Sequence, residues 1–226
     1  MSKQLEDAHL STEGAQLFCG AAQSILPELE LLISKLPRDK AGIRLNDNAE
    51  LNSILANSGS IQEIVSASLN LPGRPVRAVL FDKSAKSNWT LGWHQDRTIV
   101  VKRRVESAGY GPWTMKAGLQ HVEPPFALLQ DMVTIRIHID NVDDQNAPLL
   151  VSPGTHKLGR ITEDKIQASV NMYGSARCCA KAGDVWIFST PILHASASTL
   201  TDRRRRVLQV DYSASALPNG LEWQGI

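Results

Sequence analysis

The chain has 226 residues, which is enough to bury the core of one ordinary globular domain and too few for two. Hydrophobic residues make up 42% of it and charged residues 21%, which excludes a disordered chain. The chain has 24 Lys and Arg residues and 23 Asp and Glu residues, so its net charge is +1 and no overall electric field attracts nucleic acid or an anionic membrane. Three cysteines cannot build a disulfide framework, and neither a secretory signal nor a bilayer-spanning stretch is present. We therefore predict a cytoplasmic protein that binds neither nucleic acid nor membrane.

The first third of the chain predicts helices. Apolar residues recur at helical spacing over residues 12–36, with an interruption at Pro27. Asn48 or Asp47 can cap a helix over residues 49–55, and residues 60–63 match a capping box that opens a helix ending near residue 69.

From residue 74 onward, short β-rich runs separated by turn residues replace the helical pattern. They cover residues 76–81, 97–101, 132–140, 149–151, 185–188, 192–195 and 205–212. Runs of this number and spacing are typical of a β-sandwich or a closed barrel. We predict one domain over residues 1–226, made of a helical N-terminal part (1–73) and a β-stranded core (74–226).

The run 134–140 has the clearest strand pattern. Three isoleucines share one face, and the opposite face carries Thr134, Arg136, His138 and Asp140. A sheet edge with its polar face in solvent explains this alternation, and so does a barrel whose lumen is polar because it holds a site.

A set of metal-ligating residue types follows in order along the β-rich part. His94 and Asp96 lie two apart, so their side chains project to the same side of a strand, and a second histidine, His194, follows downstream. Two histidines and one carboxylate on one face of a metal are the ligands of non-haem Fe(II) oxygenases. Where 2-oxoglutarate is the electron source, its far carboxylate needs an arginine and a hydroxyl group. Ser196 and the arginine run 203–206 can supply them.

These motifs resemble the phytanoyl-CoA dioxygenase family of Fe(II)- and 2-oxoglutarate-dependent oxygenases over about residues 76–213. Three segments are similar to family motifs in order and spacing: Trp-His-Gln-Asp at 93–96, Asn-Ala-Pro-Leu through Pro-Gly-Thr-His-Lys at 146–157, and Gly-Asp through His-Ala-Ser at 183–196. Ala147 stands where the family usually has glycine. The resemblance implies a mainly β fold with N-terminal helices, namely a double-stranded β-helix (a cupin-like jelly roll).

The resemblance also implies roles for individual residues. The metal ligands are His94, Asp96 and His194. The arginine eleven residues after the distal histidine is Arg205, with Arg203 the alternative if the strand begins later. Ser196 and Thr134 are expected to bind 2-oxoglutarate together with Arg205.

Substrate contacts are expected from the long irregular stretch 97–130 and from the polar strand face. The predicted substrate-binding residues are Trp93, Arg97, Lys116, His121 and Arg136. A mobile lid with solvated charges is the alternative reading of Lys116 and His121. Arg77 and Lys83 are further candidates to reach the co-substrate, with a surface position as the alternative for the lysine. His138 is interpreted as a histidine satisfied by hydrogen bonds.

The resemblance implies an enzyme that uses Fe(II), 2-oxoglutarate and O2 and releases succinate and CO2. We expect hydroxylation of a small polar metabolite or natural-product intermediate, with desaturation, cyclisation or epimerisation as alternatives. Outside this class, a non-catalytic jelly-roll binding protein or a zinc hydrolase with the same three ligands are the competing hypotheses. The oligomeric state stays open.

Overall fold

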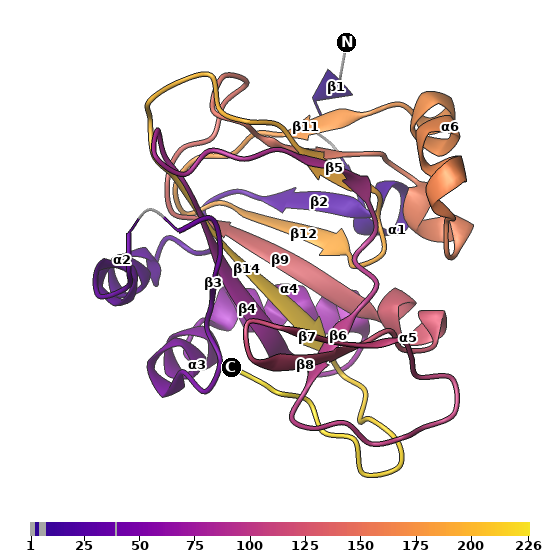
Figure 1. The fold of residues 1–226 in the computed structure, drawn as a ribbon. Helices are drawn as coiled ribbons and strands as arrows, with labels where there is room; N and C mark the ends of the chain where they lie inside the picture. The colour runs from indigo at the N-terminus through magenta and orange to yellow at the C-terminus, as the bar shows by residue number, and fades with distance from the viewer. Residues whose placement is uncertain (1–2, 5–7, 39) are drawn as a thin grey trace.

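The computed structural model describes residues 3–4, 8–38 and 40–226, and its framework is two facing β-sheets (Figure 1). The larger sheet has six strands in the order β2 (Ala15–Phe18), β12 (Val185–Ser189), β9 (Met132–His138), β14 (Arg205–Ser213), β4 (Arg74–Lys83) and β3 (Ile43–Arg44). The smaller sheet has the order β1 (Lys3–Gln4), β11 (Ala176–Cys178), β10 (Leu149–Val151), β13 (His194–Ser196) and β5 (Leu91–His94). All their pairings are antiparallel except that of β1 with β11.

A third, three-stranded sheet and the helices complete the fold. The small sheet has the order β6 (Ile99–Val101), β8 (Leu119–Val122) and β7 (Trp113–Lys116). The helices are α1 (Leu10–Glu13), α2 (Leu26–Ser34), α3 (Ala49–Ala56), α4 (Gly59–Leu69), α5 (Phe126–Gln130) and α6 (Glu163–Tyr173), and a 3-10 turn covers Thr155–Leu158. No helix in these described ranges is long and apolar enough to cross a bilayer.

The main core lies between the larger sheet and the helices that cover its outer face. Ile135 and Ile137 of β9 are fully buried there, in one cluster with residues of α2, α3 and α4, and Figure 1 shows α4 behind the sheet. Strand alternation then turns Thr134, Arg136 and His138 to the inner face, toward the smaller sheet. The polar lumen is therefore the correct interpretation of the 134–140 pattern, because these three residues are buried rather than in solvent.

The N-terminal prediction is correct for α2, α3 and α4 but wrong over residues 15–18. Asn48 caps α3 by accepting a hydrogen bond from the backbone N–H of Leu51. α4 begins two residues before the predicted capping box, at the Ser58 cap. Ala15–Phe18 is a strand rather than a helix, because it completes the edge of the larger sheet by pairing with β12.

Replacing Ile137 with alanine is expected to lower the free energy of unfolding by about 2–5 kcal/mol, because the side chain is fully buried between the sheet and the helices. Urea denaturation measures this change. The matched control is Leu31→Ala in α2, whose side chain is 60% exposed, and its effect should stay within about 0.5 kcal/mol. Equal effects at the two sites would contradict the assigned orientation of β9.

Candidate metal and co-substrate site

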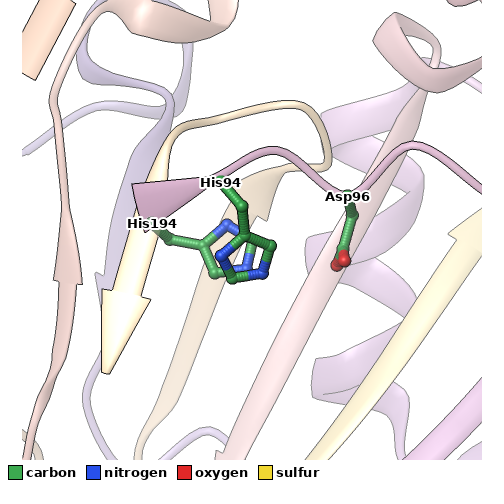
Figure 2. Close-up of side chains that lie close together, drawn as sticks. All are labelled: His94, Asp96 and His194. Atoms are coloured by element: carbon green, nitrogen blue, oxygen red, sulfur yellow. The ribbon is translucent and has the colours of Figure 1, made fainter. Parts of the chain in front are cut away.

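Three metal-ligating side chains meet between the two sheets. β5 ends at His94 and β13 begins at His194, and the antiparallel register places the two residues opposite each other. Asp96 follows in the loop after β5. One ligand atom from each residue lies within 4.8 Å of the other two, and the imidazole centroids are 4.2 Å apart. Figure 2 shows the three side chains converging on the same space.

Backbone carbonyls fix the tautomer of both histidines. The Nδ1 of His94 lies 2.7 Å from the carbonyl oxygen of Gly92, and the Nδ1 of His194 lies 3.0 Å from that of Ile192. A carbonyl oxygen can only accept, so each Nδ1 carries the proton and donates it. Each Nε2 therefore keeps a free lone pair, as a metal ligand requires.

The electrostatics of the triad also suit a divalent cation. Burial lowers the pKa of His194 to about 4, so this imidazole is neutral at physiological pH. Burial raises the pKa of Asp96, but the interactions with His194 and with the positive charge of Arg77 outweigh it and the net direction is down. A carboxylate with two imidazoles that each present a free Nε2 fits the two-histidine, one-carboxylate ligand set.

Gln95 anchors the loop that carries this triad. Its side-chain amide donates to the carbonyl oxygens of Gly159 and Pro191 at 3.0 and 2.8 Å and accepts from the N–H of Ile161. Because Gln95 stands between the first two ligands and is 4% exposed, these bonds fix their separation.

A cationic pocket, defined here as Lys83, His138 and Arg205, lies beyond the triad. Lys83 is fully buried, and its Nζ donates to Ser196 Oγ and to the carbonyl oxygen of Trp89, both at 2.9 Å, and also to the carbonyl oxygen of Ala197. Arg205 is 2% exposed and donates to the carbonyl oxygen of Ala147. Arg205 Nε and His138 Nδ1 are buried without a partner among the described residues.

Among the described residues, no acidic side chain is found to act on the positive charges of this pocket. Burial, with the positive charges of Arg205 and Arg136, lowers the pKa of Lys83 to about 7. Burial and Arg136 lower the pKa of Arg205 to about 9. Buried donors without partners and cations without counter-ions are expected where an anion binds.

The protonation of Lys83 predicts a pH-dependent stability. Its pKa is about 7 in the folded protein and 10.5 in the unfolded chain, so between these values the unfolded chain binds more protons and stability rises with pH. Lys83→Met is expected to flatten this rise, which is measured as the difference in unfolding free energy between pH values near the folded and the unfolded pKa of Lys83. Lys165→Met, at an exposed position in α6, should keep the wild-type slope. An unchanged slope in Lys83→Met would contradict the burial of a titrating amine.

Strand alternation separates the four arginines. Arg205 faces inward, whereas Arg204 pairs with Asp82 and Arg206 pairs with Asp140 on the other face of β14. Arg203 precedes the strand and forms a half-exposed ion pair with Asp143. Of the two alternatives left by the sequence, only Arg205 lies in the pocket.

The structure does not bring Thr134 to Arg205. Thr134 pairs in register with Asp211, six residues along β14 from Arg205, which is about 20 Å of strand. Its hydroxyl donates to Asp211 and contacts Thr190 Oγ1 at 3.2 Å. The residue that β9 contributes to the pocket is His138. Because its Nδ1 has no partner, the interpretation of His138 as a histidine satisfied by hydrogen bonds is wrong for this nitrogen.

Arg136 is the predicted substrate residue that lies beside the triad. It lines a small cavity of about 10 Å³ together with Asp96, Thr134 and His194. Its guanidinium donates twice to Gln209 Oε1, at 3.1 and 2.8 Å, and lies 5.3 Å from the centre of the Phe81 ring. A larger groove, between α1 and α4, is lined by none of the triad residues.

The other predicted substrate residues are spread around the site. Trp93 packs against the apolar cluster beside α6, and Arg97 donates to the carbonyl oxygen of Ile161. Both side chains therefore stabilise the segment around Ile161. Lys116 is exposed on β7. His121, on the adjacent strand β8, is 2% exposed.

Comparisons with known proteins agree with this geometry. The model of one family, described as phytanoyl-CoA dioxygenase (PhyH), matches residues 58–207, more than half of the chain. L-proline trans-4-hydroxylase of Streptomyces griseoviridis is 26% identical over 141 residues, which are 51% of this chain and 52% of that protein. The chain thus spans about half the length of this curated relative.

Solved structures share the fold at low identity. EctD from S. alaskensis, with 2-oxoglutarate and 5-hydroxyectoine, is 15% identical with a TM-score of 0.66, covering 100% of this chain and 83% of that one. The epimerase SnoN, in complex with Fe3+, alpha ketoglutarate and nogalamycin RO, is 14% identical with a TM-score of 0.62, covering 90% and 80%. The predicted jelly roll is confirmed by these likenesses and by the two facing sheets. The chain therefore belongs to the phytanoyl-CoA dioxygenase family, and the prediction of an oxygenase that works with iron and 2-oxoglutarate is confirmed at the level of the family.

Proposed function

We propose that the protein holds Fe(II) on His94, Asp96 and His194 and binds 2-oxoglutarate with its far carboxylate in the cationic pocket. The observation that carries this proposal is the pairing of the two features: a triad suited to a divalent metal and, beyond it, buried cations without a counter-ion. Ser196 follows His194 by two residues, about 7 Å along β13, a separation that a five-carbon dicarboxylate spans.

Each residue of the pocket has a defined task. Arg205 presents a guanidinium with an unused Nε–H to the carboxylate. Lys83 adds a second positive charge and holds the hydroxyl of Ser196 in place. His138 is kept neutral by burial, so its ring can donate without adding charge. Bound Fe(II) supplies the redox chemistry with O2, and the protein groups orient the co-substrate and keep it out of water.

We propose hydroxylation of a small polar molecule, with release of succinate and CO2. A hydroxylase among the curated relatives supports this outcome. Epimerisation is a second candidate, because an epimerase shares the fold. A single domain over residues 1–226, a location in the cytoplasm and the absence of nucleic-acid partners are parts of the same proposal, drawn from composition and charge.

Succinate release tests the class, and product mass tests the outcome. The protein should form succinate from 2-oxoglutarate only when Fe(II) and O2 are both present. Hydroxylation adds one oxygen atom to the substrate, desaturation or cyclisation removes two hydrogen atoms, and epimerisation leaves the mass unchanged. A zinc hydrolase or a binding protein would release no succinate under any of these conditions.

A further inference from the structure

A second polar cluster lies at the other end of β4 and β14 from the cationic pocket. Arg77 is six residues before Lys83 on the same face of β4, and its Nη1 donates to Asp211 Oδ2 at 3.1 Å. Asp211 also accepts from Thr134 at 3.0 Å and from Gln209 at 3.3 Å. Because its oxygens already accept three hydrogen bonds, Asp211 holds Arg77 in place and has little capacity left for a ligand.

The three-stranded sheet brings His121 to the same place. The three-stranded sheet packs on this end of β4 through a cluster that includes Val76 and Val122, so β8 lies near the part of β4 that carries Arg77. Burial and the nearby positive charges of Arg77, Lys116 and Arg44 lower the pKa of His121 to about 4. The imidazole is therefore neutral and can donate one N–H.

Several donors of this cluster have nothing to bind among the described residues. Arg77 Nε and Arg44 Nε are buried without a hydrogen-bond partner, and so are both ring nitrogens of His121, of which one donates and the other accepts. His121 is only 2% exposed, so water does not readily satisfy it. Since buried polar groups are nearly always paired, donors that lack partners together indicate a ligand.

The cluster faces the metal triad. Arg77 and Asp96 act on each other electrostatically, the arginine lowering the pKa of the carboxyl. Asp211, which holds Arg77, also binds Thr134, and Thr134 lines the same cavity as Asp96 and His194, so a molecule bound to Arg77 lies on the triad's side of the sheet. The formal charges of Arg44, Arg77 and Asp211 leave one net positive charge, which matches one carboxylate better than a doubly charged phosphate.

We propose that the substrate is a small carboxylic acid, the amino acids included, and that Arg77 and His121 bind its carboxylate while Asp211 positions the arginine. This inference rests on the proposed function, because it gives the substrate class of the same site. It assigns two different carboxylates to the two ends of the β4–β14 pair: the co-substrate at Arg205 and the substrate at Arg77.

Paired probes test the class. Free amino acids and small mono- and dicarboxylic acids, each with its carboxamide and its decarboxylated analogue, are screened for stimulation of succinate formation. At least one acid should stimulate, and its carboxamide should require a concentration about tenfold to a hundredfold higher, the cost of losing a charge-assisted hydrogen bond. Stimulation by carboxamides as strong as by acids would overturn the proposal.

Variants at the Arg77 end of β4 then separate substrate from co-substrate. Arg77→Gln should raise KM for the acid about tenfold to a hundredfold, with a much smaller rise in KM for 2-oxoglutarate. His121→Phe serves as a second variant, because it removes the ring donors without leaving Asp211 unpaired. Arg203→Gln, the same substitution in a half-exposed arginine, should behave as wild type.

The outcomes distinguish this inference from the proposed function. If the protein shows Fe(II)-dependent background succinate formation but no acid of the panel stimulates it, the substrate class is wrong and the function stands. If no succinate forms in any mixture, the proposed function fails first. Calorimetric titration of the stimulating acid into the Mn(II)- and 2-oxoglutarate-loaded protein gives an independent readout, and equal affinity for wild type and both variants would refute the site.

Discussion

Replacing His194 with alanine is expected to abolish the turnover of 2-oxoglutarate, lowering kcat by about three orders of magnitude or more. The variant keeps His94 and Asp96 but loses the ligand that faces His94 across the β13–β5 pair. Two protein ligands hold a divalent metal far less tightly than three, so metal affinity should fall with activity. Succinate formation gives the first value, and calorimetric titration with Mn(II) gives the second.

The matched control for this substitution is His9→Ala, at an exposed position outside the site. It should leave both metal affinity and turnover unchanged. A folded His194→Ala protein that forms succinate at the wild-type rate would refute the ligand assignment. Loss of turnover with undiminished metal affinity would show that His194 serves turnover without binding the metal.

The rule that residues two apart on a strand share a face led to the correct pairing of His94 with Asp96, although for a different physical reason. β5 ends at His94 and Asp96 lies in the following loop, which the hydrogen bonds of Gln95 hold in place. The same rule separated Thr134, Arg136 and His138 from the isoleucines of β9. Only the pairing of β5 with β13, which brings in His194, needed the resemblance to a known family.

The composition of the cationic pocket could not be predicted in the same way. Which residue of β9 lies near Arg205 depends on the register between β9 and β14, and a register is set by contacts across the sheet. Counting along the chain suggested Thr134, whereas the observed register puts His138 there. The register between β4 and β14 likewise sets Lys83 opposite Arg205 and Arg77 opposite Asp211, which decides between the two basic candidates.

Secondary structure was misassigned where tertiary pairing overrides local preference. Ala15–Phe18 has apolar residues at helical spacing, but it is a strand because β12 offers an unpaired edge. The hairpin of β7 and β8 was expected to be an irregular loop, since its strands are only four residues long and β7 is largely exposed. This hairpin carries His121, which was predicted as a substrate-binding residue, but its burial on a strand could not be predicted from a stretch expected to be irregular.

Arg205→Gln is expected to raise KM for 2-oxoglutarate by about a hundredfold, the effect of removing a charge-assisted pair worth about 3 kcal/mol. The arginine is 2% exposed, so neither water nor salt replaces it at the carboxylate. Glutamine keeps a donor of similar shape and removes the charge. Because the metal ligands are untouched, Mn(II) affinity should stay close to that of the wild type while the 2-oxoglutarate requirement rises.

Thermal stabilisation by the co-substrate supplies the readout that does not depend on turnover. A ligand stabilises the folded state in proportion to the logarithm of its concentration over Kd, so a hundredfold weaker Kd removes about 2.7 kcal/mol of that effect at saturation. The upward shift of Tm by 2-oxoglutarate should therefore nearly vanish in Arg205→Gln and persist in Arg203→Gln. If both variants kept the shift, the far carboxylate of 2-oxoglutarate would bind elsewhere. A loss of the shift confined to Arg77→Gln would mean that 2-oxoglutarate binds at Arg77 rather than at Arg205.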